Sequence, residues 1–391
     1  MIKWFVSAIL TLGFYSAKTQ SQAPYIAGKT LGKLPFLEYG LGEDRLGGAK
    51  MGFLDSNILL RVVDSSGTDY KVMLSANHHA YITKTSVQLL AGMRFQPYYL
   101  SNSWKVWGDT EYDYVSLQLD EKLPYHSFQE INPSRIVVDI FGITSNTNWI
   151  TQLKTVKEVK NAWYEQVEDD VMRVFIELKH KQHWGHWVYY DSAAKPRLVI
   201  RVRRQPASLD IKKLKIAVDA GHGGDNEGAT GVNTGILEKE YTLLIAKELE
   251  KALKKEKAKV VMTREKDTSL SMPERIEFLH EQSPDLLVSI HLNSGSSDTV
   301  RGASTYYRYI GFRPLSQSIL KRMLELKLEE FGNVGSFNFG LNGPTEYPNC
   351  LVEVAFLSNP SDEKKIRDPA FRKAVAKKIV DGIRDWLLTV R

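Results

Sequence analysis

The hydrophobic pattern changes near residue 205, and this change constrains the fold more than any other feature of the sequence. Before it, short runs such as 135–140 and 172–178 alternate apolar and polar residues. After it, short apolar runs alternate with longer stretches of helical periodicity, such as 238–254. Period-two runs are typical of half-buried strands, whereas alternating strands and helices indicate helices that cover a mostly parallel sheet. We therefore predict an α/β C-terminal domain, residues 211–391, preceded by one or two all-β modules.

The predicted elements of the α/β domain follow directly from this alternation. Each strand is a short apolar run, and each helix is a longer amphipathic stretch. Pro273 falls in the first turn of the second helix, where proline is well tolerated. The predicted strands are 215–218, 259–262, 286–290, 303–307 and 350–354, and the predicted helices are 238–254, 273–282, 315–331 and 369–388.

The section 24–100 is predicted to be a β-rich module. Residues 24–54 are rich in glycine and charge and show little periodicity, so we expect irregular structure there. Strand-like runs separated by turn residues then follow, and a small twisted barrel would hide their edges. This section loosely resembles a bacterial SH3-like module, and a β-rich extension of the next domain is the alternative. The predicted strands are 58–63, 70–74 and 79–83.

The section 101–205 is predicted to be a β-sandwich, because its short strands are evenly spaced. The segment Pro133-Ser-Arg-Ile-Val-Val-Asp-Ile-Phe-Gly142, the strand 171–178 and a closing strand resemble the AMIN domain. That resemblance implies a small sandwich beside an envelope enzyme, which binds the wall or envelope protein partners. It assigns no binding residues. The predicted strands are 114–119, 135–140, 172–178, 187–190 and 197–202.

Three histidines near the end of this section, His180, His183 and His186, raise the question of a metal site. On a strand, His183 and His186 would point to opposite faces, although in a loop the two could converge. Trp184 and Trp187 lie beside them and would suit an aromatic surface that stacks on sugars. The plainer interpretation, a polar and aromatic strand edge, is preferred.

The first 23 residues have the pattern of a secretory signal peptide. Lys3 precedes a short apolar run, residues 4–15, and small and polar residues follow in 16–23. The apolar run is shorter than a membrane span, which is typical of a signal. An uncleaved anchor or a first core strand is the alternative. We expect an exported protein, in the periplasm or outside the cell, without a stable transmembrane segment.

Charge and cysteine content limit the partners and the covalent chemistry. The formal charge of +6 is compatible with an anionic partner such as a cell-wall polymer or a nucleic acid. No long block of Lys and Arg concentrates this charge, so we expect no nucleic-acid partner. Cys350 is the only cysteine, and no intrachain disulfide can therefore form.

Four residues of the α/β domain could form a catalytic site. His222 follows the first predicted strand in a glycine-rich turn, and His291 ends the third strand. If these strands are parallel, both histidines lie at the carboxyl rim of the sheet, where ligand sites of α/β sheets occur. Glu238 begins the first long helix, and Glu353 lies near the end of the last strand.

These residue types suit zinc hydrolysis. Two neutral imidazoles and one carboxylate, from His222, Glu238 and His291, are a catalytic zinc set with a fourth position left for water. Zinc lowers the pKa of such a water and polarises a carbonyl. A further carboxylate, Glu353, could take the proton and pass it to a leaving amine. The long spacing alone is weak evidence, because His and Glu scattered through an α/β domain are common.

Five motifs in a fixed order make the interpretation more specific. They are Val218-Asp-Ala-Gly-His-Gly-Gly224, Gly235-Ile-Leu-Glu-Lys239, Thr263-Arg-Glu-Lys-Asp267, Val288-Ser-Ile-His-Leu-Asn293 and Leu351-Val-Glu-Val-Ala-Phe-Leu-Ser-Asn359. Together they resemble the zinc-dependent N-acetylmuramoyl-L-alanine amidases, the type 3 amidases of bacterial cell walls. The resemblance covers Ile211 to Arg391.

The resemblance implies that His222, Glu238 and His291 hold Zn²⁺ and that Glu353 is the catalytic carboxylate. The implied reaction is hydrolysis of the amide between N-acetylmuramic acid and L-alanine in peptidoglycan. Two positions depart from the family pattern, since Ala220 stands where proline is frequent and Ala355 where glycine is frequent. Neither departure touches a predicted ligand.

Two structural expectations and two alternative functions complete the sequence interpretation. Arg264 and Asp267 are expected to form a structural pair. The stretch between His291 and Glu353 has no room for a helical insertion that would plug the site, so we expect an open cleft. The alternative functions are a non-catalytic peptidoglycan-binding protein on the same scaffold and a zinc peptidase that acts on the peptide stem.

Overall fold

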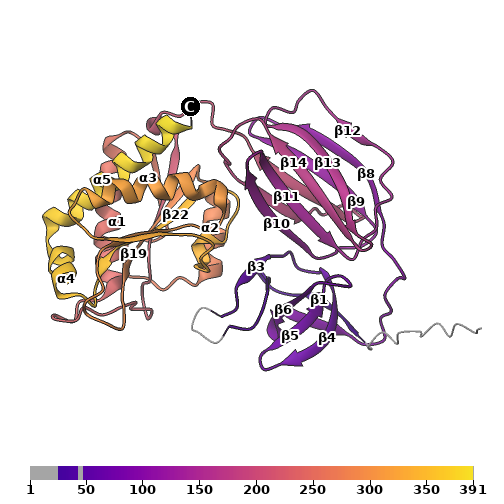
Figure 1. Cartoon of the computed structure of the whole chain (residues 1–391), viewed down its shortest axis with the longest axis horizontal. Coiled ribbons are helices and arrows are strands. Elements are labelled where there is room, and N and C mark those ends of the chain that lie inside the picture. Colours follow the sequence, from indigo (N-terminus) through magenta and orange to yellow (C-terminus); the bar gives the residue numbers. More distant parts are fainter. Residues whose placement is uncertain (1–24, 43–46, 391) are drawn as a thin grey trace, which may run out of the picture.

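Residues 25–42 and 47–390 are described by the computed structural model of the chain, and the predicted signal peptide, residues 1–23, lies outside them. The described residues form four sheets. In Figure 1 the α/β part lies on the left, a β-sandwich lies at the upper right, and a smaller β module lies below. Among these residues, no helix combines the length and the apolar character needed to cross a membrane.

The first module, residues 24–100, contains a seven-stranded sheet with the order β3-β2-β6-β5-β4-β1-β7. The prediction that residues 24–54 are irregular is wrong, because β1, β2 and β3 lie there. These strands are short, and β1 and β3 contain glycine, so their own alternation is weak, and pairing with neighbouring strands determines their conformation. The strands are β1 (Ile26–Thr30), β2 (Phe36–Glu38), β3 (Lys50–Phe53), β4 (Leu59–Ser66), β5 (Asp69–Met73), β6 (His79–Thr83) and β7 (Val87–Leu90).

The section 101–205 forms the predicted sandwich. Its two sheets have the strand orders β10-β11-β14-β13 and β12-β8-β9-β16-β15. The apolar residues of both inner faces belong to one buried cluster, as the alternation predicts. The strands are β8 (Ser101–Gly108), β9 (Tyr112–Leu119), β10 (Tyr125–Ile131), β11 (Ser134–Phe141), β12 (Ile150–Gln152), β13 (Val159–Glu168), β14 (Val171–Leu178), β15 (His186–Tyr190) and β16 (Arg197–Arg203).

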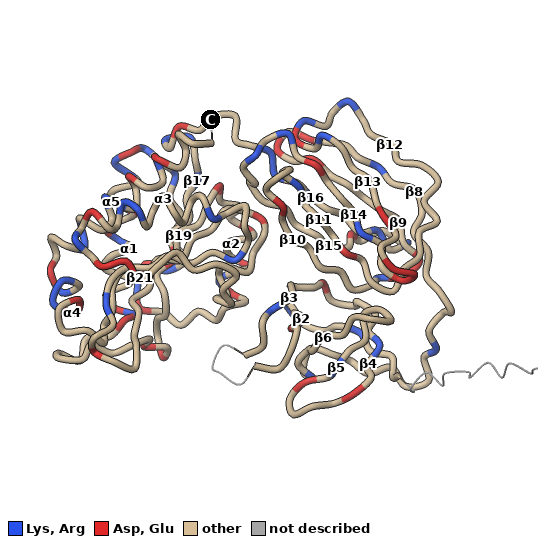
Figure 2. Tube along the Cα trace, in the orientation of Figure 1, with Lys and Arg blue, Asp and Glu red and all other residues tan. Residues whose placement is uncertain are grey.

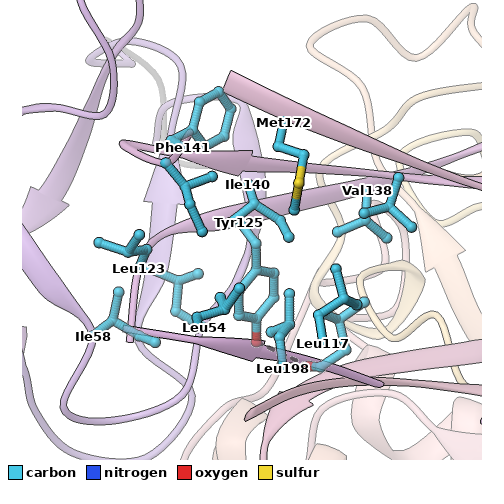
Figure 3. Packing of buried hydrophobic residues seen from close by; sticks show 14 of the residues in the cluster. Leu54, Ile58, Leu117, Leu123, Tyr125, Val138, Ile140, Phe141, Met172 and Leu198 are labelled. Carbon is cyan, nitrogen blue, oxygen red and sulfur yellow. Dashed lines mark hydrogen bonds between the residues drawn. The ribbon is translucent and has the colours of Figure 1, made fainter. Parts of the chain in front are cut away.

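The core of the sandwich continues into the first module. Leu54 and Ile58 of the first module pack in the same cluster as Leu123 and Tyr125 of the sandwich (Figure 3). Asp55 crosses the same boundary, where its carboxylate accepts a hydrogen bond from the Tyr190 amide at 2.6 Å. The first module is therefore packed firmly against the sandwich.

The C-terminal domain has a six-stranded sheet with the order β18-β17-β19-β22-β20-β21. Strands β17, β18, β19 and β22 run parallel, and only the β20–β22 pair is antiparallel, so the predicted mostly parallel sheet is confirmed. The strands are β17 (Lys215–Ala220), β18 (Lys259–Met262), β19 (Leu286–Asn293), β20 (Ala303–Tyr306), β21 (Glu330–Val334) and β22 (Asn349–Phe356). The helices are α1 (Glu238–Lys255), α2 (Met272–Gln282), α3 (Arg313–Leu324), α4 (Pro360–Arg367) and α5 (Pro369–Thr389).

Both faces of this sheet are covered, which is why its strands are apolar at consecutive positions. Ile216 and Val218 of β17 pack in the cluster that includes apolar residues of α1, α3 and α5. Ala217 points to the opposite face and packs with Ile276 and Leu279 of α2. The layered arrangement leaves the carboxyl ends of β17 and β19 at one rim of the sheet.

One predicted helix is shorter than expected. The stretch 315–331 was predicted to be helical throughout, but α3 ends at Leu324 and β21 begins at Glu330. Lys327 has a φ of 57°, which breaks the helix, and Leu328 is then buried in the core. Because α3 and the turn after it both place apolar residues inward, helical periodicity alone could not locate the end.

The histidine-rich segment forms an interface between the sandwich and the C-terminal domain. Trp184 is 1% exposed and packs against Trp386 of α5, with the ring centroids 5.1 Å apart. Gln182 accepts a hydrogen bond from the Trp386 indole at 3.0 Å. His183 and His186 are buried, and among the described residues neither belongs to a group that could hold a metal ion. His186 begins β15, which is an edge strand of its sheet, as the preferred interpretation expects, but this edge is buried, and Trp184 is therefore not part of an open aromatic surface.

Burial of these histidines predicts acid sensitivity. Burial lowers the pKa of His183 to about 4 and that of His186 to about 3. The unfolded chain binds protons at these positions from a pKa of about 6.5 downward, so folding is most stable above that pH. As the pH falls from 6.5 to 4, each histidine should lower the free energy of unfolding by about 1.4 kcal/mol per pH unit. Urea unfolding at several pH values measures this slope.

A variant with His183→Gln and His186→Gln isolates the effect. Glutamine does not titrate, so the variant should lose less stability than the wild type between pH 6.5 and 4. Equal slopes in the two proteins would contradict the assignment.

Candidate active site and metal centre

The structure brings His222, Glu238 and His291 together at the carboxyl rim of the sheet. One ligand atom from each residue lies within 4.8 Å of the others. The Glu238 carboxylate oxygen Oε1 is 3.0 Å from His222 Nε2 and 3.0 Å from His291 Nδ1. The three residues come from a turn, a helix start and a strand end, and are therefore adjacent only in the folded chain.

The His222 side chain is held by its turn. His222 adopts a φ of 61°, which is uncommon for a residue other than glycine. Its Nδ1 lies 2.8 Å from Asn226 Oδ1, an arrangement that orients the ring and leaves Nε2 facing Glu238. A side chain at the neighbouring Gly221 would overlap the His291 ring, so the close approach of the two histidines requires glycine there.

Glu238 is buried at the first position of α1, where the helix N-terminus favours a negative charge. Its oxygens also accept hydrogen bonds from the amides of Ala229 at 2.8 Å and Leu292 at 3.0 Å. Burial alone would raise the pKa of Glu238, but the bonds to His222 and His291 outweigh it and leave the pKa well below its usual value. The carboxylate is therefore ionised although it is buried.

This set of donors fits a zinc ion. Donor atoms of two imidazoles and one ionised carboxylate lie close together. The side chains of His222 and His291 are 21% and 20% exposed, respectively. Zinc in hydrolases is held by such sets of three, and the exposure leaves access for a water or a substrate. The predicted ligands His222, Glu238 and His291 thus form a candidate metal site.

Glu353 lies next to this site. It is paired with His291 in the parallel register of β19 and β22, and it is 6% exposed. Both residues line a cleft of about 970 Å³ together with His222 and Glu238. Glu353 thus lies on a strand next to that of His291 and lines the same cleft as the three converging residues.

An aromatic wall on the loop 335–343 bounds the same cleft. The ring of Phe339 lies parallel to that of His291, with centroids 6.4 Å apart. Phe339 contacts Phe337 at 4.6 Å and Tyr306 at 5.1 Å between centroids. Helix α3 packs on α5 and β20.

The sequence interpretation missed the pair Asp219 and Arg275, which holds the turn of His222. The Asp219 carboxylate accepts hydrogen bonds from Arg275 at 2.5 Å and from Ser289 at 2.6 Å. Arg275 also donates to the carbonyl oxygens of Ala220 and His222. Burial tends to raise the pKa of Asp219, but Arg275 and the hydrogen bonds lower it below the usual value. A charged residue at the end of an apolar strand was the available signal.

Arg264 and Asp267 both stabilise the site region, but the expected ion pair between them is not among the pairs of the described residues. Arg264 donates to the carbonyl oxygens of Ala220 and Gly221, each at 2.9 Å. Asp267 instead accepts from Lys239 Nζ at 3.1 Å. Arg264 thus binds the backbone of the turn, which its planar group with several donors suits well.

Metal binding is the first test of this site. The wild-type protein should bind one zinc ion per chain, and the His222→Ala variant should lose most of it because one of three donors is gone. Metal analysis of the purified proteins measures occupancy. Zinc at about 100 times its Kd should stabilise the wild type by about 2.7 kcal/mol. His180→Ala is the control, since His180 lies outside the site, and equal occupancy in all three proteins would contradict the assignment.

Arg275→Ala tests the support of the turn. Removing one partner of a buried ion pair typically costs about 3–5 kcal/mol, because the other charge stays buried. The variant should therefore unfold at lower denaturant concentration and bind zinc about 10- to 100-fold more weakly. Denaturant unfolding and a zinc titration measure the two effects. A stability within 1 kcal/mol of wild type, roughly, would show that Asp219 does not need this partner.

Comparison with known proteins indicates the family of the chain. Residues 216–385 match the family described as N-acetylmuramoyl-L-alanine amidase, and residues 103–205 match the AMIN domain. A probable cell wall amidase LytH of Staphylococcus saprophyticus is 29% identical over 251 residues, which are 62% of this chain and 84% of the relative. The LytH protein of Staphylococcus epidermidis is 33% identical over 181 residues, and the match spans 46% of this chain and only 60% of the relative.

A solved structure is also similar. The catalytic domain of CwlV, an N-acetylmuramoyl-L-alanine amidase from Bacillus (Paenibacillus) polymyxa, has 33% sequence identity and a TM-score of 0.43. The match covers 46% of this chain and 99% of that domain. The two family matches follow each other in the order sandwich and α/β domain. The chain therefore belongs to the N-acetylmuramoyl-L-alanine amidase family of cell-wall hydrolases, with an AMIN domain in front of its amidase domain.

Proposed function

We propose that this protein is a zinc-dependent hydrolase of peptidoglycan, which cleaves the amide between the lactyl group of N-acetylmuramic acid and L-alanine. The observation that carries the proposal is the convergence of His222, Glu238 and His291 within 4.8 Å, in a domain that matches the amidase family. Glu353 lines the same cleft and supplies the carboxylate that such a reaction needs. The products are a glycan with a free lactyl carboxylate and an intact peptide stem.

The metal and the side chains of the protein would supply different parts of the chemistry. His222, Glu238 and His291 would hold the zinc ion, which when bound would supply polarisation of the scissile carbonyl and a lower pKa of the attacking water. Glu353 accepts the proton of this water and returns it to the nitrogen of the leaving L-alanine. Asn226 orients the His222 ring through Nδ1, so Nε2 stays available as a donor to the metal.

The substrate places the protein outside the cytoplasm, and the family acts on the cell wall. We propose export through the signal peptide of residues 1–23, to the periplasm or the exterior. The AMIN domain would hold the enzyme at the wall or at an envelope protein partner. Its firm packing against the amidase domain at Trp184 and Trp386 supports a fixed orientation of the two.

The role of Glu353 is tested by Glu353→Gln, which keeps the shape and removes the proton acceptor. Hydrolysis of purified sacculi should fall about a hundredfold or more, whereas zinc content should stay at the wild-type level. A chelator should abolish wild-type activity, and added zinc should restore it. Glu330→Gln on the exposed β21 is the control and should keep full activity.

Mass spectrometry of the released fragments separates the alternatives. An amidase leaves intact peptide stems and sugar-linked lactate, whereas a stem peptidase leaves shortened stems. Binding of sacculi without any released product would indicate a non-catalytic wall-binding protein. Full activity of the Glu353→Gln variant would reject the role given to this carboxylate.

A further inference from the structure

The first module contributes to the active-site cleft of a domain that follows it by more than a hundred residues. Lys50, the first residue of β3, lines the same cleft as His222, Glu238 and His291. Figure 1 shows β3 on the side of the first module that faces the amidase domain. β3 is also an edge strand of its sheet, so its outer backbone groups are open to another part of the chain.

Hydrogen bonds fix this edge to the amidase domain. The Lys50 amide donates to Asn338 Oδ1 at 3.1 Å, and Asn338 Nδ2 donates to the Gly48 carbonyl at 2.7 Å. The Arg308 guanidinium donates to the carbonyl oxygens of Lys50 and Met51. Asn338 stands between Phe337 and Phe339, the aromatic residues of the cleft wall. The backbone of Lys50 is thus held directly against that wall.

Apolar packing strengthens the contact below the hydrogen bonds. Phe53 and Leu34 pack against the buried cluster that includes Leu341 and Ile276 of α2. A side-chain carbon at Gly343 would come within 2.8 Å of the Phe53 ring, so the two surfaces are in close contact. An exposed ion pair between Lys33 and Glu277 lies at the margin of the same interface. The first module therefore forms a packed part of the cleft wall.

The Lys50 ammonium group is the unusual feature of this wall. It lies 5.0 Å above the Phe36 ring, and the described residues give it no hydrogen bond and no ion pair. Burial lowers the pKa of Lys50, while the charge of Glu38 partly offsets this effect and that of Arg308 adds to it. A half-buried cation has lost part of its hydration, and an anionic group of a bound molecule would compensate it.

Three other charged groups that line the cleft, Asp219, Arg275 and Glu238, already have partners. Asp219 is paired with Arg275, and Glu238 is bonded to both histidines. In Figure 2 both signs of charge are spread along all parts of the chain. The positive charge of Lys50 is thus a local feature of the cleft, available to the substrate.

The chemistry of the substrate identifies the group that Lys50 would meet. The lactyl carboxyl of muramic acid is consumed in the scissile amide, and the acetylated sugars carry no charge. The carboxylates near the scissile bond therefore belong to the peptide stem. We propose that Lys50 determines specificity by binding a carboxylate of the peptide stem, in the cleft that the metal site also lines. This inference rests on the proposed amidase function and adds a residue from the first module to its substrate site.

Kinetics on two matched substrates test this proposal. One is a soluble muramoyl peptide with free stem carboxylates, and the other is the same compound with these carboxylates amidated. The preference is the ratio of kcat/KM for the free over the amidated substrate. It should fall about three- to fivefold in Lys50→Met, through a higher KM for the free substrate, because a partly exposed ion pair contributes modestly to binding.

Two further variants separate charge from structure. Lys50→Arg keeps the charge and should retain the preference, whereas Lys71→Met removes a charge from β5 of the same module and should not change it. A preference that is unchanged in Lys50→Met would overturn the proposal. So would an equal loss of kcat/KM on both substrates, since that result would show that Lys50 only supports the fold.

A binding measurement keeps this test independent of turnover. Zinc-loaded Glu353→Gln protein, with and without Lys50→Met, is titrated calorimetrically with both muramoyl peptides. The Kd for the free peptide should rise about three- to fivefold with Lys50→Met, and the preference over the amidated peptide should fall accordingly. If the wild type hydrolyses neither compound, the proposed reaction is wrong, and the Kd values still decide whether Lys50 recognises the carboxylate.

Discussion

A buried carboxylate, Asp219, joins the elements on which the site depends. It lies one residue before the end of β17 and accepts hydrogen bonds from Ser289 of β19, Arg275 of α2 and Thr263 after β18. Arg275 also donates a hydrogen bond to the carbonyl oxygen of His222. Burying two charges is costly, and apolar residues would often stabilise a core equally well. The pair is best understood as a means of orienting the turn, because its hydrogen bonds are directional where apolar contacts are not.

The metal donors depend on this frame and on one another. Glu238 remains ionised at the start of α1 because two histidines and two backbone amides surround its oxygens. Glycine at position 221 lets the rings of His222 and His291 approach. Two parts of the chain form the wall of the cleft beyond them. One is the aromatic loop of the amidase domain, and the other is the β3 edge of the first module, which is hydrogen-bonded to that loop. The cleft is thereby built from two parts of the chain, whereas the proposed metal donors and Glu353 lie in one domain.

Much of the fold could be predicted, and the errors have physical causes. The strands of the amidase domain were found because both of their faces are buried, which makes them apolar at consecutive positions. The strands within residues 24–54 were missed because β1, β2 and β3 are short, and their extended conformation depends on pairing with neighbouring strands. Helix α3 was extended too far because the turn after it also places Leu328 in the core. Trp184 seemed to suit a surface, but it faces Trp386 across a domain interface.

The sequence by itself determined the chemistry of the site. Short motifs around His222, Glu238, His291 and Glu353 identify donors whose types suit zinc hydrolysis, and the alternation of strands and helices places them at one rim. Only the tertiary structure decided that Asp219 pairs with Arg275, and that Lys50 lines the cleft. Both results depend on contacts between residues far apart in the chain, from 56 positions for the first pair to 288 for Lys50 and Asn338. Such contacts follow from the complementary shapes of folded surfaces, which no local period or motif encodes.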